Sequence, residues 1–106
     1  MCEIENFPKP KIPPESLKEL VERAHLLSKE SKNVFFDAPH ARQRMRERNV
    51  TIRQIFDVLR FGKGIDGPTL DKFGDWRIKL SRYSAGRKVQ VVVAVKKERL
   101  EVITVI

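Results

Sequence analysis

The segment WRIKLSRYSAGRKVQVVVAVKKERLEVITVI, residues 76–106, decides the fold. Polar and apolar residues alternate over residues 76–83, as they do on a β-strand with one covered face. Residues 89–95 are a nearly continuous valine run, which is typical of a central strand covered on both faces. Residues 100–106 supply a third strand. The segment therefore predicts an antiparallel meander of three strands.

Two tight turns predict the register of this meander. Residues 85–86 and 97–98 each suit a two-residue hairpin loop, and counting outward from both loops pairs the three strands. One face of the sheet is then apolar and can be covered by helices. Its facing side chains are Ile78 with Val93 and Val102, and Leu80 with Val91 and Thr104.

The opposite face of the predicted sheet is mostly polar. It carries side chains from the three strands in turn, namely Arg77, Lys79, Ser81 and Tyr83, then Lys88, Gln90, Val92 and Ala94, then Glu101, Ile103 and Val105. In one row Ala94 separates Arg77 from Glu101, and its small side chain leaves room for the two long ones to meet. This face is either the solvated side of the sheet or a platform for RNA, on which Tyr83 stacks with a base.

The residues before the meander predict an α+β protein with helices on one face of a small antiparallel sheet. Residues 1–14 hold four of the six prolines and form an extended arm, residues 15–61 are helical, and residues 65–106 form the sheet. The 106 residues make a single domain. The apolar residues on the polar face need a cover, for which the arm, a ligand and a second copy of the chain stay open.

Three helices are expected in the helical part. A capping box at residues 16–19 starts the first, and its apolar stripe leaves His25 on the surface. Pro39 favours a second helix that begins near His40 and breaks at Asn49. A second capping box at residues 51–54 starts the third helix, which ends at residues 62–64. Its core face is predicted to be Ile52, Ile55, Phe56 and Leu59, with an ion pair between Arg53 and Asp57.

Composition narrows the function. Cys2 is the single cysteine and the chain has only two histidines, so we expect no disulfide, no metal site and no cofactor. No apolar run is long enough to cross a membrane, and no signal peptide is recognisable, so we expect a cytoplasmic protein that does not bind membranes. Residues 38–106 hold sixteen Lys and Arg against seven acidic residues, a net charge of +9. Such a charge favours polyanions or an acidic protein partner, although an uninvolved basic surface is also common.

The helix HARQRMRERNV, residues 40–50, concentrates this charge. His40, Arg44 and Arg48 recur at every fourth position and lie on one stripe, while Arg42 and Arg46 form a second stripe. Ala41 and Met45 face the core. We expect the four arginines, together with Lys88 and Gln90 of the sheet, to bind nucleic acid. His40 and the arginines are expected to form a positive rim to the polar sheet face. The alternative is a solvated helix surface with local ion pairs.

The string F-x-x-x-H-A-x-x-R-M-x-x-R-x-V-T, residues 36–51, followed by V-V-V-A-V and V-I-T-V-I, resembles a family of small uncharacterised bacterial domains. These domains are similar to the RelE superfamily of toxins, with the BrnT and MqsR toxins as nearer relatives. The resemblance covers residues 34–106. It implies a RelE-like α+β fold and a toxin of a type II toxin–antitoxin system that cleaves mRNA, free or on the ribosome, without a metal. A cognate antitoxin would hold such a toxin inactive.

The resemblance also implies roles for residues of the polar face. Arg77 and Lys79 would bind the phosphate, Glu101 or His40 would act as the base, and Tyr83 would stack or donate a proton. Three functions therefore stay open. The chain is an endoribonuclease, or a non-catalytic nucleic-acid-binding module of the same fold, or an interaction protein that docks an acidic peptide or a second copy of itself.

Overall fold

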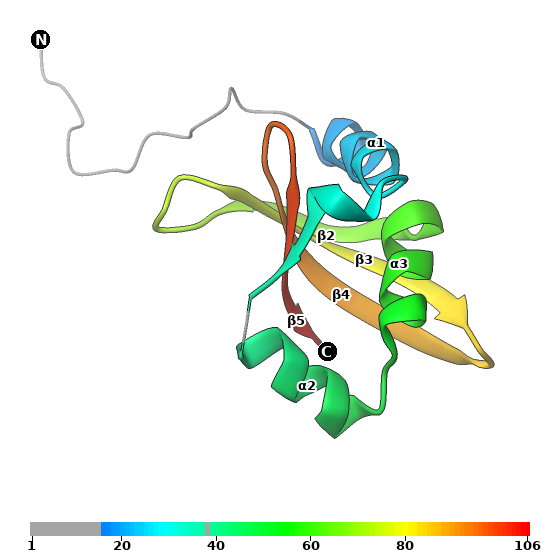
Figure 1. The fold of residues 1–106 in the computed structure, drawn as a ribbon. Coiled ribbons are helices and arrows are strands. Elements are labelled where there is room, and N and C mark those ends of the chain that lie inside the picture. Colours follow the sequence, from blue (N-terminus) through cyan, green and yellow to red (C-terminus); the bar gives the residue numbers. More distant parts are fainter. Residues whose placement is uncertain (1–15, 38) are drawn as a thin grey trace, which may run out of the picture.

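The computed structural model of the protein describes residues 16–37 and 39–106, so the predicted arm of residues 1–14 lies outside the described residues. Three helices, α1 (Leu17–Leu27), α2 (His40–Arg48) and α3 (Ile52–Phe61), pack against a five-stranded sheet in the strand order β1-β5-β4-β3-β2. Figure 1 shows all three helices on the same side of the sheet. The predicted α+β class is therefore confirmed. None of the helices in the described residues is long and apolar enough to cross a membrane.

The helices begin and end where the sequence predicts. Ser16 and Glu19 form the capping box of α1, and Thr51 and Gln54 form that of α3. Helix α2 ends at Asn49, which adopts a left-handed conformation (φ 57°, ψ 47°) that asparagine tolerates better than most residues. Each of these signals satisfies free backbone groups within a few residues, so it is readable without knowledge of the tertiary structure.

The core lies between the helices and the inner face of β3 (Trp76–Ser84), β4 (Arg87–Val95) and β5 (Leu100–Val105). Within α3, Ile55 and Leu59 are fully buried as predicted, and Val58 joins them. The prediction for Ile52 is wrong, because its side chain is 44% exposed. The predicted pair of Arg53 with Asp57 is also wrong. Asp57 Oδ1 instead lies 3.2 Å from Nε of Arg82 in β3, which is brought against α3 by the packing.

The meander has the predicted loops. Ala85 and Gly86 both have positive φ (53° and 82°), as a two-residue hairpin loop requires, and Ser84 pairs with Arg87. Ile78 faces Val93, as predicted.

The predicted register fails at the end of β5. A bulge at Ile103 pairs Val91 with Val105 instead of Thr104, and Val92 with Thr104. The extra residue turns the following side chains to the other face of the sheet. Val105 therefore lies in the core, 1% exposed, and not on the polar face where the uninterrupted register had placed it.

Two strands were not predicted, and the sheet starts earlier than residue 65. Strand β1 (Val34–Phe36) pairs in parallel with β5, so the sheet is not purely antiparallel. Strand β2 (Lys63–Leu70) pairs with β3 through two irregularities of register. The sequence hides both, because β1 has three residues and β2 contains two glycines and a proline.

His25 is half-buried and not a surface residue as predicted. Its Nε2 lies 2.8 Å from the backbone oxygen of Gly62, so it ties α1 to the end of α3.

Candidate functional site

The sheet face opposite the helices carries most of the predicted site. Register places Arg77 beside Ala94 and Ala94 beside Glu101, as predicted, while Lys79 lies beside Val92. Tyr83, beside Lys88, is 74% exposed at the hairpin end of this face. We call this surface the open face. Its members are Phe35, Lys63, Asp66, Thr69, Arg77, Lys79, Ser81, Tyr83, Lys88, Gln90, Val92, Ala94, Glu101 and Thr104.

Arg77 is held in place by the carboxylate of Asp71, which no pattern in the sequence indicates. Its Nε lies 3.0 Å from Oδ2 of Asp71, in the turn between β2 and β3. Oδ1 of Asp71 accepts hydrogen bonds from the backbone amides of Phe73 (2.8 Å) and Asp75 (3.0 Å). The contact with Asp71 uses one of the five N–H groups of the guanidinium. The remaining four are chemically suited to a phosphate, and the guanidinium is already oriented.

These contacts set the ionisation of Asp71. Burial raises the pKa of its carboxyl, but the two amide hydrogen bonds and Arg77 lower it more strongly, so the pKa lies below its ordinary value. Asp71 therefore stays ionised as the pH falls to about 4, the ordinary range of an aspartate. Its contribution to stability and to the orientation of Arg77 is present above that range and is lost at lower pH.

Glu101 was predicted to meet Arg77 across Ala94, and this prediction is wrong. Its Oε1 lies 3.4 Å from Nζ of Lys96, which also lies 3.7 Å from Oδ2 of Asp75. Lys96 follows β4 directly, and its side chain is largely buried. Arg77 and Glu101, at the two ends of the row, are thus each paired with an oppositely charged residue from a turn between strands, Asp71 and Lys96 respectively.

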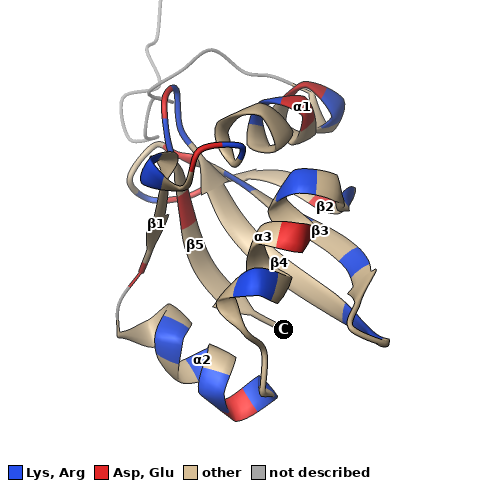
Figure 2. Ribbon diagram, turned by 45° about the vertical axis from the view of Figure 1, so that its right-hand side comes forward, with Lys and Arg blue, Asp and Glu red and all other residues tan. Residues whose placement is uncertain are grey.

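The basic helix does not share the open face. Helix α2 packs on β5 within the helix layer, where Ala41 and Met45 are buried as predicted. Figure 2 shows the arginines of α2 in blue along the helix, on the inner side of the sheet. His40 and the arginines therefore lie across the sheet from Arg77, and the predicted positive rim to the polar face is wrong.

Two of the α2 arginines have side-chain contacts within this layer. Arg44 pairs with Glu47 (3.3 Å), and the guanidinium of Arg42 lies 5.4 Å from the centre of the Phe36 ring. Arg46 and Arg42 line a shallow hollow of about 270 Å³ with Asn49. The C-terminal carbonyls of α2, at Arg48 and Asn49, accept from Arg87 of the β3–β4 hairpin. Some of the arginines of this protein therefore stabilise the fold through these contacts.

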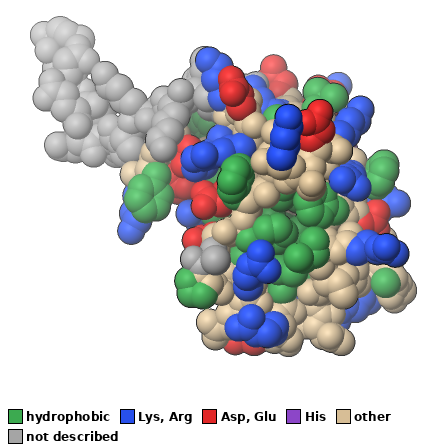
Figure 3. Space-filling model, viewed as in Figure 1, with side chains coloured by type: hydrophobic (Ala, Val, Ile, Leu, Met, Phe, Trp, Pro, Cys, Tyr) green, Lys and Arg blue, Asp and Glu red, His purple; other side chains and the backbone are tan. Residues whose placement is uncertain are grey.

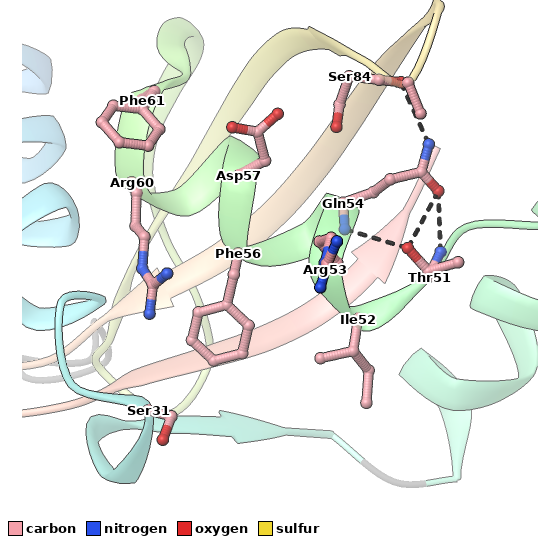
Figure 4. A pocket seen from close by; sticks show the side chains of 11 residues that line it. Ser31, Thr51, Ile52, Arg53, Gln54, Phe56, Asp57, Arg60, Phe61 and Ser84 are labelled. Atoms are coloured by element: carbon pink, nitrogen blue, oxygen red, sulfur yellow. Dashed lines mark hydrogen bonds between the residues drawn. The ribbon is translucent and has the colours of Figure 1, made fainter.

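A second surface surrounds α3 on the helix side. An open hollow of about 740 Å³ runs along the helix and is flanked by the β3–β4 hairpin and by Ser31 of the short 3₁₀ helix η1 (Ser31–Asn33). Figure 4 shows Phe56 and Arg60 pointing toward Ser31, while Gln54 reaches the backbone oxygen of Ser84. Figure 3 shows hydrophobic side chains gathered near the middle of this side, with Lys and Arg around them.

Charged and aromatic side chains stack along the hollow. The Arg60 guanidinium lies 4.9 Å from the centre of the Phe56 ring, and its Nε donates to the backbone oxygen of Ser28 (2.8 Å). Phe61 is 62% exposed and lies under Arg82 at 5.1 Å. Large exposed apolar side chains in one place are typical of an interaction surface.

No group of three His, Cys, Asp or Glu residues that could hold a metal is present in residues 16–37 and 39–106. A model of the family described as "Domain of unknown function (DUF4258)" matches residues 38–106. No curated protein and no solved structure is significantly similar to the chain.

Proposed function

Because the chain belongs to the DUF4258 family, whose description names no activity, we propose its function from the residues of its open face. The domain binds single-stranded RNA on this face and cleaves it without a metal. It does so as the toxin of a toxin–antitoxin pair in the cytoplasm. The observation that supports this most is the placement of Arg77 and Lys79 two residues apart on one mostly polar face, with Arg77 oriented by Asp71. Arginine in a fixed orientation is well suited to a phosphate.

The remaining residues of the face suit an RNA chain. Tyr83 is exposed at one end, where a base can stack on its ring. Strand residues rise about 3.3 Å each, so Tyr83 lies about 13 Å from Lys79 along β3. At that distance Tyr83 stacks with a neighbouring nucleotide and does not protonate the group that leaves the phosphate bound by Lys79.

The proposed cleavage uses the ribose as its own nucleophile. The 2′-oxygen forms a bond to phosphorus as its proton moves to the carboxylate of Glu101, and the bond from phosphorus to the 5′-oxygen breaks. Lys79 donates a proton to the departing 5′-oxygen, while Arg77 offsets the negative charge of the phosphorane. His40 is left out of this scheme, since α2 lies across the sheet.

Incubation of a long mRNA in excess EDTA with the full chain tests this proposal. We expect cleavage by the wild type and loss of at least about a hundredfold in rate for Arg77→Ala/Lys79→Ala, because each removed charge stabilises the transition state by a few kcal/mol. Arg42→Ala/Arg46→Ala removes the same charge from the helix layer and should cleave normally. Circular dichroism verifies that all three proteins fold. Undiminished cleavage by the Arg77/Lys79 variant would remove these residues from the mechanism.

A second candidate function is RNA binding without cleavage. It is favoured by the ion pair of Glu101 with Lys96, which engages the one carboxylate that the scheme uses as a base. In the same experiment, this function predicts intact RNA at every protein concentration and retention of the RNA that weakens as salt rises.

We further propose that the hollow along α3 binds the cognate antitoxin. Ile52 and Phe61 are exposed on it, and arginines 53 and 60 line it, so an amphipathic segment with acidic flanks complements both its apolar and its charged parts. This partner is favoured over a second copy of the chain, because two copies with a net charge of +8 each would repel one another.

Ile52→Asp should weaken antitoxin binding by at least about tenfold, since it places a charge in the apolar centre of the contact and faces acidic flanks. The measurement is calorimetric titration with the protein encoded by the adjacent reading frame, beside Tyr83→Ala as a matched change on the open face. Equal affinity of Ile52→Asp and wild type would place the antitoxin elsewhere. Dimerisation that Ile52→Asp abolishes would assign the hollow to a second copy.

A further inference from the structure

A small hollow on the open face lies where β2 departs from regular pairing. Asp66 pairs with Lys79 and Thr69 with Arg77, so two residues of β2 lie between these pairs where β3 has one. The extra residue bends β2 away from its neighbour. The space that results has a volume of about 150 Å³ and opens between Arg77, Lys79 and Val92 on one side and Asp66 and Thr69 on the other.

The shape of this hollow depends on Gly67. Its backbone φ is +101°, a value that residues with a side chain rarely adopt. A Cβ added at this position would lie 2.8 Å from the backbone oxygen of Arg77. Glycine therefore lets the bulge approach β3 closely. The backbone amide of Gly67 donates to Oδ1 of Asp66 (2.8 Å), so the carboxylate is held at the edge of the hollow by the turn itself.

The hollow has two cations on one side, Arg77 and Lys79, and a carboxylate, Asp66, on the other. Arg77 and Lys79 suit the phosphates of an RNA chain, whereas the carboxylate of Asp66 repels them. An ionised carboxylate accepts hydrogen bonds only, with about four lone-pair positions, of which the Gly67 amide uses one. Asp66 therefore suits a ligand group that donates hydrogen bonds and that lies next to a phosphate bound by Arg77 and Lys79. The floor at Val92 is apolar, which suits the flat face of a ring.

We propose that this hollow binds one base of the RNA, with guanine preferred. The inference rests on the proposed RNA-binding function and adds a sequence preference to it. A volume of about 150 Å³ is below the roughly 300 Å³ of pockets for drug-sized ligands, so it suits a single ring system. Guanine presents N1–H and the N2 amino group side by side, which matches the two oxygens of one carboxylate. Uracil presents one N–H between two carbonyl oxygens that Asp66 repels, and adenine and cytosine each present one amino group beside an acceptor nitrogen.

Four nine-residue RNAs that differ only in a central G, A, C or U within an adenosine background test the inference. Binding to the full chain is measured by fluorescence anisotropy at low salt and 4 °C, and a gel verifies that the RNA stays intact. We expect the wild type to prefer G by about tenfold, as a two-point base contact typically gives. Asp66→Asn should reduce this preference to about twofold or less while it binds the other three RNAs at least as well, because a negative charge beside the phosphates is lost. Glu98→Gln, an exposed carboxylate in the β4–β5 turn, should retain the preference.

The outcomes separate the two proposals. If all four RNAs bind equally to the wild type, or if Asp66→Asn keeps the preference for G, the base site is wrong while RNA binding stands. If none of the RNAs binds at low salt, the RNA-binding function itself is wrong and the base site falls with it. Thermal unfolding of Asp66→Asn verifies that a lost preference does not come from an unfolded protein.

Discussion

The affinity of this domain for single-stranded RNA is expected to fall about fifty-fold when monovalent salt rises from about 50 to about 200 mM. The open face carries four cationic side chains, Lys63, Arg77, Lys79 and Lys88. Each phosphate that a cation neutralises releases about 0.7 of a counterion from a single strand, so four contacts give a slope of about −3 in a plot of log affinity against log salt. Nitrocellulose filter binding at several salt concentrations measures this slope.

Variants on the two sides of the sheet show which cations contribute. Arg77→Ala/Lys79→Ala should reduce the slope to about −1.4, because two of four contacts remain. Arg42→Ala/Arg46→Ala should leave it unchanged, since α2 lies across the sheet. The opposite pattern, in which the α2 variant alone flattens the slope, would move the RNA to the helix layer and would contradict the proposed site.

Leu80→Ala should lower the free energy of unfolding by about 2 to 5 kcal/mol, the usual range for a leucine removed from a well-packed core. Leu80 is fully buried on the inner face of β3, opposite Val91 and under the helices. A domain of this size has a total stability of only about 5 to 15 kcal/mol. The melting temperature should therefore fall by at least about 8 °C, which differential scanning calorimetry measures.

Leu26→Ala is the matched control, since it removes the same atoms from a side chain that is 63% exposed on α1. A change of no more than about 0.5 kcal/mol is expected there. If the two variants were equally stable, the helices would not cover the inner face of the sheet as the structure has them.

The two candidate surfaces lie on opposite sides of the sheet, which has a consequence for control of the proposed toxin. An antitoxin on the α3 hollow would not cover Arg77 or Lys79 directly. Inhibition would then need a second segment of the antitoxin that reaches the open face, or an assembly too large for the RNA to approach. Titration of RNA onto the antitoxin complex of the wild type tests this point. RNA that still binds would show that the antitoxin leaves the open face uncovered, and loss of RNA binding would show that the antitoxin or its assembly blocks that face.

Local patterns predicted much of the fold, because the interactions behind them span only a few residues. The capping boxes at residues 16–19 and 51–54, the end of α2 at Asn49 and the hairpin loop at residues 85–86 all appear where expected. The alternation of residues 76–83 likewise assigned Arg77 and Lys79 to the face away from the core. These placements follow from backbone geometry and from the period of a strand.

Tertiary structure decided the features that depend on residues far apart in the chain. Strand β1 exists only because β5, more than sixty residues later, offers a parallel edge. The bulge at Ile103 breaks a register that counting cannot correct, and it buries Val105. Charged side chains of the sheet form ion pairs with residues of turns and helices, such as Arg82 with Asp57 of α3.

The sequence by itself thus determined the three helices, the three strands of the meander and the placement of Arg77 and Lys79 on the face away from the core. The structure alone decided that the arginines of α2 lie on the other side, that Asp71 orients Arg77, and that a bulge in β2 opens a hollow beside Lys79. The reason is physical. Hydrogen bonds of caps and turns are made within a few residues, whereas an ion pair or a bulge forms between whichever groups the packing of distant elements brings into contact.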